Sequence, residues 1–117
     1  MAGNYSYVNG LRAKAFPINT AVGVTDTNLS LSGRAKCFNG LIIRGATATI
    51  ASATITLIIN NDTVIDGASA LFFAKDAANP RLYFEFFREL EGADTITLRI
   101  EDSAAQQLDV LVYYQDR

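Results

Sequence analysis

Residues 94–101 read Asp-Thr-Ile-Thr-Leu-Arg-Ile-Glu, and this stretch decides the fold class. Its apolar residues recur at every second position, at Ile96, Leu98 and Ile100, and polar side chains occupy the positions between them. An alternation of period two that is rich in β-branched residues is typical of a strand with one buried face. The sequence therefore predicts a half-buried β-strand at this position.

The chain on either side of this strand repeats the pattern. Residues 108–115 alternate in the same way, and their predicted inward residues are Leu108, Val110, Val112 and Tyr114. A polar loop at 102–106 connects the two segments, so we expect them to pair as an antiparallel hairpin. Residues 54–59 form another predicted strand, which turns at Asn60-Asn61-Asp62 and returns through 63–66.

The N-terminal third shows a weaker form of the same alternation. In residues 11–18, Leu11, Ala13 and Ala15 alternate with Arg12, Lys14 and Phe16. Pro17 has no N–H group to donate to a neighbouring strand, so this segment is expected at a sheet edge or to end there. Residues 21–25 and 34–44 are the next candidate strands.

Residues 80–91 fit two interpretations. Asn79, Pro80 and Gly92 stand where a helix would place its N-cap, its first residue and its stop. However, three Phe and one Tyr fall within residues 82–87, and this aromatic content favours a strand. We expect a strand and keep a helix as the alternative.

Together these segments predict an all-β protein. Six to eight short strands separated by polar turns are typical of a sandwich or a small barrel. We expect residues 1–117 to form a single antiparallel β-sandwich domain, jelly-roll-like, with about eight strands.

The amino-acid composition limits the kinds of functional site that the chain can form. Half of the 117 residues are hydrophobic, 19% are charged, the single cysteine is Cys37, and there is no histidine. The lack of histidine excludes His-based catalytic triads and most catalytic zinc sites. A lone cysteine cannot form an internal disulfide, and we expect Cys37 to be a buried, inert thiol. The sequence predicts no catalytic residue, no cofactor and no metal ligand set.

Two sets of polar residues have both a functional and an ordinary interpretation. The oxygens of Asn60, Asn61, Asp62 and Asp66 are suitable calcium ligands, but ordinary turn chemistry is the favoured interpretation. The pairs Arg12 with Lys14 and Arg34 with Lys36 lie two residues apart on predicted strands, so each pair points to one face. They are possible phosphate contacts, although a solvated strand face is favoured.

Several predicted strands are apolar on both faces. In a monomeric sandwich, one face of each strand is exposed to solvent, so a second apolar face must be buried against something else. The cover is either another copy of the protein or a loop or helix of the same chain; we favour another copy. The residues expected in such a subunit interface are Ile58, Tyr83, Phe87, Leu111 and Tyr113.

Three segments are similar to a known family. Residues 54–66, residues 90–100 and residues 108–114 resemble the hairpin, the penultimate strand and the closing strand of small trimeric jelly rolls. These are the tumour-necrosis-factor-like and complement-head-like sandwiches, an architecture shared with phage fibre, capsid and decoration proteins. The chain differs from their pattern in having Ala93 between Gly92 and Asp94. The resemblance implies a jelly roll that forms a trimer or a larger assembly.

We therefore expect a non-enzymatic virion structural protein, such as a small capsid, decoration or fibre-head subunit of a bacteriophage. Its expected partners are other copies of itself and other virion proteins, with nucleic acid a weaker expectation and no membrane. The residues near Met1 lack a signal-peptide pattern, so we expect a protein made in the host cytoplasm and kept in the virion or the cytoplasm. The alternative function is a carbohydrate- or ligand-binding β-sandwich module.

Overall fold

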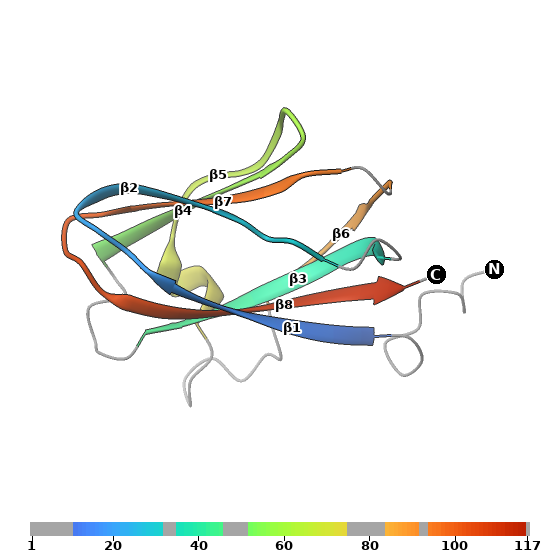
Figure 1. Ribbon diagram of the computed structural model, residues 1–117, viewed down its shortest axis with the longest axis horizontal. Helices are drawn as coiled ribbons and strands as arrows, with labels where there is room; N and C mark the ends of the chain where they lie inside the picture. Colours follow the sequence, from blue (N-terminus) through green and yellow to red (C-terminus); the bar gives the residue numbers. More distant parts are fainter. Residues whose placement is uncertain (1–10, 32–34, 46–51, 75–83, 92–93, 117) are drawn as a thin grey trace.

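The computed structural model describes residues 11–31, 35–45, 52–74, 84–91 and 94–116. These residues form two antiparallel four-stranded sheets that lie face to face (Figure 1). We refer to the sheet of order β1-β8-β3-β6 as sheet A and to the sheet of order β2-β7-β4-β5 as sheet B. The strands are β1 (Leu11–Asn19), β2 (Gly23–Asn28), β3 (Ala35–Gly45), β4 (Ala53–Ile59), β5 (Asp62–Ser69), β6 (Phe84–Glu89), β7 (Ile96–Asp102) and β8 (Gln107–Asp116).

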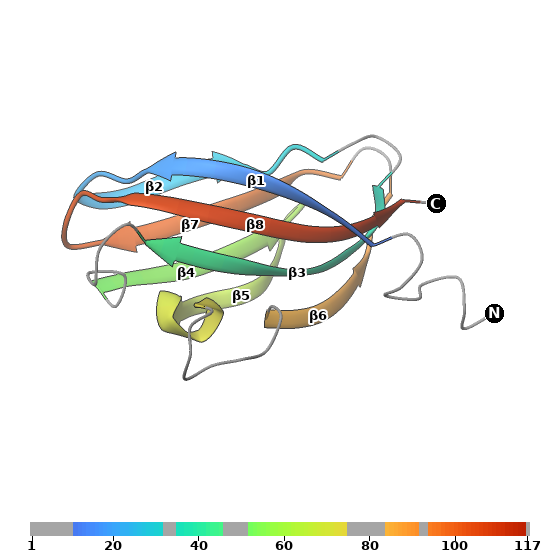
Figure 2. The same ribbon diagram turned by 90° about the horizontal axis from the view of Figure 1, so that it is seen from below.

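The order of the strands is that of a jelly roll. Along the chain, successive described strands alternate between the sheets, except for β4 and β5, which form a hairpin in sheet B. The first and last strands, β1 and β8, lie side by side in sheet A (Figure 2). The predicted fold class, an antiparallel jelly-roll-like sandwich, is confirmed.

The core lies between the sheets and consists of the residues that the period-two pattern places inward. In β7, Ile96, Leu98 and Ile100 are buried, and the intervening residues are half-buried or exposed. Strands β3, β4 and β8 contribute equivalent residues: Phe38, Leu41, Ile43, Ile55, Leu57, Ile59, Leu108, Val110, Val112 and Tyr114. The inner faces of β3, β4, β7 and β8 are therefore already committed to the core.

The predicted pairing of residues 94–101 with residues 108–115 is wrong. Strand β7 pairs with β2 and β4 in sheet B, whereas β8 pairs with β1 and β3 in sheet A. The loop between them crosses from one sheet to the other, anchored by Asp102 at its start. The side-chain carboxylate of Asp102 accepts hydrogen bonds from Ser52 Oγ at 2.6 Å, from the Ala104 N–H at 3.0 Å and from Gln106 Nε2 at 2.5 Å.

The β4–β5 hairpin is as predicted. Ile59 and Asp62 are paired, so Asn60 and Asn61 form the turn. Asn60 has a φ of 56°, a left-handed conformation that Asn tolerates better than most residues. Its side chain also joins this turn to the start of β7, because Asn60 Nδ2 donates to Asp94 Oδ1 at 2.8 Å.

Two other predictions concern the strand that contains Pro17 and the ambiguous segment at 80–91. Strand β1 lies at an edge of sheet A, as Pro17 predicted, with Phe16 and Ile18 directed to the core and Ala13 and Ala15 exposed. Residues 84–89 of the ambiguous segment form strand β6 and not a helix; residues 80–83 lie outside the described residues. A short 3₁₀ helix, η3 (Ala70–Phe73), follows β5 and packs on β3 and β4.

Candidate functional site

The outer face of sheet A carries a row of apolar side chains. In β8, Leu111 alternates with the buried residues Val110 and Val112, so its side chain points away from the core and is half-buried. Strand pairing places Ala15 of β1 on one side of Leu111 and Ile42 of β3 on the other. Three neighbouring strands thus contribute one aliphatic side chain each, and together these form a continuous apolar strip.

This strip lies in a shallow groove with a volume of about 460 Å³. The groove is lined by Ala15, Ile42, Val110 and Leu111, with Arg44 and Asp109 at one end. Arg44 and Asp109 pair across β3 and β8, with 3.6 Å between Nη2 and Oδ2, and their side chains are 75% and 59% exposed. An ion pair as exposed as this one adds little to stability, so both charges are available to a partner.

The opposite end of the same face is closed by buried polar residues. Cys37 pairs with Gln115, and the Asn39 amide Nδ2 donates to Gln115 Oε1 at 2.9 Å. All three residues are at most 1% exposed. Burial raises the pKa of the Cys37 thiol to about 11, which agrees with the predicted inert cysteine. These three residues are therefore closed to a partner, unlike the aliphatic strip and its charged end.

The structure separates the residues that the sequence grouped into one interface. Leu111 and Tyr113 lie on the outer face of sheet A, as strand alternation requires. Phe87 is 53% exposed on the edge strand β6, next to Arg88, which points the other way to bind Asp62 of sheet B at 2.7 Å. Phe87 thus belongs to the same outer face.

Ile58, in contrast, lies on the outer face of sheet B, on the far side of the sandwich. Ile58 therefore does not share a face with Leu111 and Tyr113, with which the sequence grouped it, because period two shows that a residue points outward but not from which sheet. Tyr83 lies outside the described residues.

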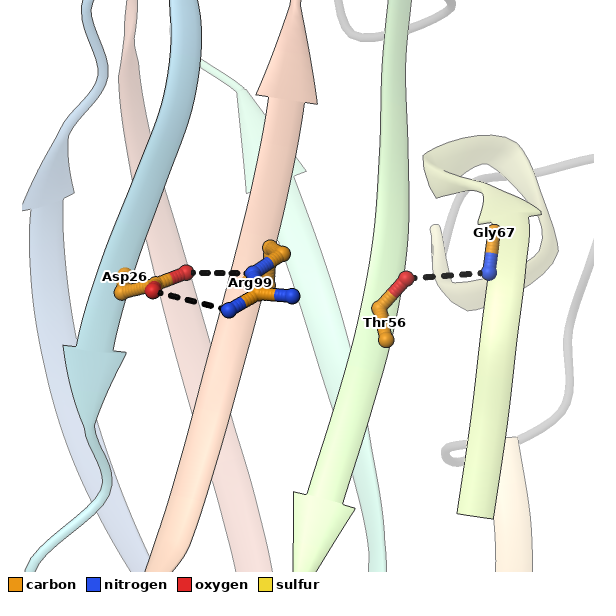
Figure 3. Close-up of polar contacts among 4 residues, drawn as sticks. All are labelled: Asp26, Thr56, Gly67 and Arg99. Carbon is orange, nitrogen blue, oxygen red and sulfur yellow. Dashed lines mark hydrogen bonds and ion pairs between the residues drawn. The ribbon is translucent and has the colours of Figure 1, made fainter. Parts of the chain in front are cut away.

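The outer face of sheet B is mostly polar, although Ile58 and the 55% exposed Val24 also lie on it, and it carries an ion pair. Asp26 of β2 and Arg99 of β7 form a bidentate pair, with Nε–Oδ1 at 2.9 Å and Nη2–Oδ2 at 3.2 Å (Figure 3). The hydrogen bonds from Arg99 lower the pKa of Asp26. On β4, Thr56 Oγ1 accepts a hydrogen bond from the Gly67 N–H at 3.0 Å. This face is suited to water and differs in character from the face of sheet A.

The proposed phosphate contacts are only partly described. Arg12 and Lys14 are exposed on β1, Arg34 lies outside the described residues, and no side-chain placement is described for Lys36. The Lys14 ammonium donates to the Ser30 carbonyl at 2.7 Å and lies 5.2 Å from the centroid of the Phe16 ring. Lys14 therefore already helps to hold β1 against the end of β2.

The acidic residues near the turns have structural hydrogen bonds. Asp94 binds the side chain of Asn60 and the backbone N–H of Glu91, and these bonds lower its pKa. Asp62 binds Arg88. Within the described residues, acidic and cysteine side chains form no group of three or more that is suited to a metal ion.

One exposed surface was not predicted from the sequence. In η3, Leu71 and Phe72 are 52% and 62% exposed, while Ala70 and Phe73 on either side of them are buried in the core. The run Leu71-Phe72-Phe73 shows only that a short apolar segment follows β5. Which of its side chains point outward depends on the 3₁₀ geometry, which the pattern of a four-residue segment does not reveal.

No helix among the described residues is long and apolar enough to cross a membrane. Comparison of the chain with protein-family models, with curated proteins and with solved structures found no match.

Proposed function

We propose that this chain is a non-enzymatic structural protein of a virion, such as a small capsid, decoration or fibre-head subunit of a bacteriophage. It acts by self-assembly, and copies contact one another through the outer face of sheet A. The observation that carries this proposal is the aliphatic strip of Ala15, Leu111 and Ile42. These side chains point outward from a domain whose inner faces already fill the core.

The size of this face sets the expected strength of the contact. With about 4.8 Å between strands and about 3.4 Å per residue, a four-stranded face as long as the 10 residues of β8 covers at most about 19 Å by 34 Å, or roughly 650 Å² per copy. A standard specific interface buries about 800 Å² per partner. The outer face of sheet A is thus large enough for a weak, specific contact, and a stable assembly needs a second contact as well.

The jelly-roll strand order supports a role in a virion. This order recurs in viral capsid domains, and the hairpin at 54–66 and the two C-terminal strands resemble small trimeric jelly rolls of the kind found in phage fibres. Fold alone does not define function, so the proposal depends on the apolar outer face. Other virion proteins and nucleic acid are further candidate partners, the latter through Arg12.

A ligand-binding module is the second candidate, and the groove is the observation that favours it. Its volume of about 460 Å³ lies within the range of roughly 300–1,000 Å³ that is typical of small-molecule sites. The described residues that line the groove include no aromatic ring on which a sugar could stack. The groove therefore favours an apolar occupant over a carbohydrate.

A pair of matched variants tests the proposal. Leu111→Asp places a charge in the aliphatic strip, and Ile58→Asp makes the same kind of change at a half-buried outward position of the other sheet. Light scattering after size exclusion should show that Leu111→Asp is monomeric and that Ile58→Asp is assembled like the wild type. Circular dichroism checks that both variants are folded. Equal assembly of the two folded variants would show that the face of sheet A is not the contact.

A further inference from the structure

The exposed part of η3 is a second apolar surface on the same chain. We call Leu71 and Phe72 the η3 knob. Their exposures of 52% and 62% are unusual for large apolar side chains that adjoin a buried Phe73. Side chains of this size that remain in water are typical of interaction sites.

The η3 knob is held in place by its surroundings. Phe73 and Ala70 are anchored in the core, and η3 packs on β3, β4 and β5. The Ser69 hydroxyl accepts a hydrogen bond from the Leu71 N–H at 3.3 Å, and the Ala74 N–H donates to the Leu71 carbonyl at 3.4 Å. A knob fixed in this way loses little conformational entropy when it binds, and preorganisation of this kind favours association.

The groove on sheet A and the η3 knob are complementary in shape and chemistry. The groove is concave and aliphatic, with a volume that accommodates two large side chains, whereas the knob is convex and presents one aliphatic and one aromatic side chain. The two surfaces lie on different parts of the molecule. The groove crosses β1, β8 and β3, and η3 packs beside β3 and β5 at the sandwich edge (Figure 2).

We propose that the η3 knob of one copy binds in the sheet A groove of the next copy. This inference rests on the proposed function and adds the identity of the groove's occupant. The second copy is the favoured occupant because every copy carries both the open groove and the exposed η3 knob. Each copy then makes two contacts, whereas the sheet A face alone gives one that is smaller than a standard interface. Phe72 would fill the strip beside Leu111, with Arg44 and Asp109 at the rim of the contact.

Such a contact is heterologous, because two different surfaces of the chain meet. Each copy then offers one free knob and one free groove, and addition continues until a ring closes or a filament forms. A face-to-face contact between two sheet A surfaces would be isologous and would stop at a dimer. The number of subunits therefore distinguishes the two arrangements.

A mixing experiment tests the inference. Phe72→Ser removes the knob and keeps the groove, and Leu111→Asp removes the groove and keeps the knob. Each variant alone should be monomeric, and an equimolar mixture should form a one-to-one heterodimer that cannot grow, seen by sedimentation velocity. Val22→Ser, at an apolar residue that is 72% exposed in the β1–β2 turn, is the control and should assemble like the wild type.

The outcomes separate this inference from the proposed function. If Phe72→Ser assembles like the wild type while Leu111→Asp is monomeric, the sheet A face is a contact but the knob is not its partner, and the inference is overturned alone. The inference also fails if both variants are monomeric and their mixture stays monomeric. If the wild type itself is monomeric at every concentration, the proposed function fails together with it.

Discussion

Replacing Asp102 tests how the crossover between the two sheets is held. Asp102 is 4% exposed and ends β7, where the chain leaves sheet B for β8 of sheet A. Ser52, Ala104 and Gln106 all donate hydrogen bonds to its carboxylate. Asp102→Ala removes both acceptor oxygens and with them these three hydrogen bonds.

The expected loss of stability depends on whether each donor finds another hydrogen-bond partner. A buried donor without a partner costs about 1–3 kcal/mol, and a hydrogen bond to a charged group contributes about 1.5–3 kcal/mol. The Ser52 side chain is exposed enough to bind water, so the loss falls mainly on Ala104 and Gln106. We expect Asp102→Ala to lower the free energy of unfolding by about 3 kcal/mol, a large part of the roughly 5–15 kcal/mol typical of a domain.

Asp102→Asn is the matched variant, and it separates charge from hydrogen bonding. Its Oδ1 still accepts from Ser52 and Ala104, and the Gln106 amide can turn to present its oxygen to the new NH₂ group. We expect a loss of about 1 kcal/mol, the difference between a charged and a neutral acceptor. Urea denaturation followed by circular dichroism measures both variants.

The pH dependence gives a second measurement on the same residue. Burial by itself raises the pKa of Asp102, but the hydrogen bonds from Ser52, Gln106, Ala104 and Ser103 outweigh it and lower the pKa below the ordinary aspartate value of 3.8. Its contribution to stability is therefore present above that value and is lost as the pH falls through the lower pKa of the folded state. Asp102→Asn should lose less stability than the wild type between pH 5 and 2. Equal stability of Asp102→Ala and the wild type at pH 7 would refute the reasoning.

Two further predictions concern the core and the thiol. Leu57→Ala should lower the free energy of unfolding by about 3 kcal/mol because Leu57 is fully buried. Ile58→Ala changes the neighbouring outward position and should lower it by only about 1 kcal/mol. Urea denaturation of both variants measures the two losses, and equal losses would contradict the assigned faces of β4. Cys37 has a pKa of about 11 and no exposed surface, so it should react with a disulfide reagent at pH 8 only after the protein is unfolded. The absorbance of the thiolate that the reagent releases measures the reaction, and rapid release from the native protein would contradict the prediction.

Local patterns predicted which residues enter the core. The alternation at Ile96, Leu98 and Ile100 and the alternation at Leu108, Val110 and Val112 both correspond to buried faces. Each of these predictions depends on a single strand and its side-chain period, which is a property of the local sequence. The turn at Asn60 was predictable for the same reason.

Strand partners were not predictable in the same way. A short loop between β7 and β8 indicates a hairpin, but in this protein the loop crosses to the other sheet, where β8 pairs with β1 and β3, which are distant in the sequence. Ile58 was grouped with the wrong face for the same reason. The local sequence shows which side of its own strand a residue lies on, but it does not show to which sheet that strand belongs. The groove and the η3 knob required the three-dimensional arrangement, since each depends on segments that are distant in the sequence.

The subunit number of the wild-type chain in solution tests the central claim most directly. Light scattering over a range of protein concentrations, without added ligand, should show a mass above 12.7 kDa that rises with concentration toward a multiple of the chain mass. A mass that stays at 12.7 kDa over the whole range would show that the aliphatic strip of sheet A remains in water, and it would contradict assembly as the role of this protein.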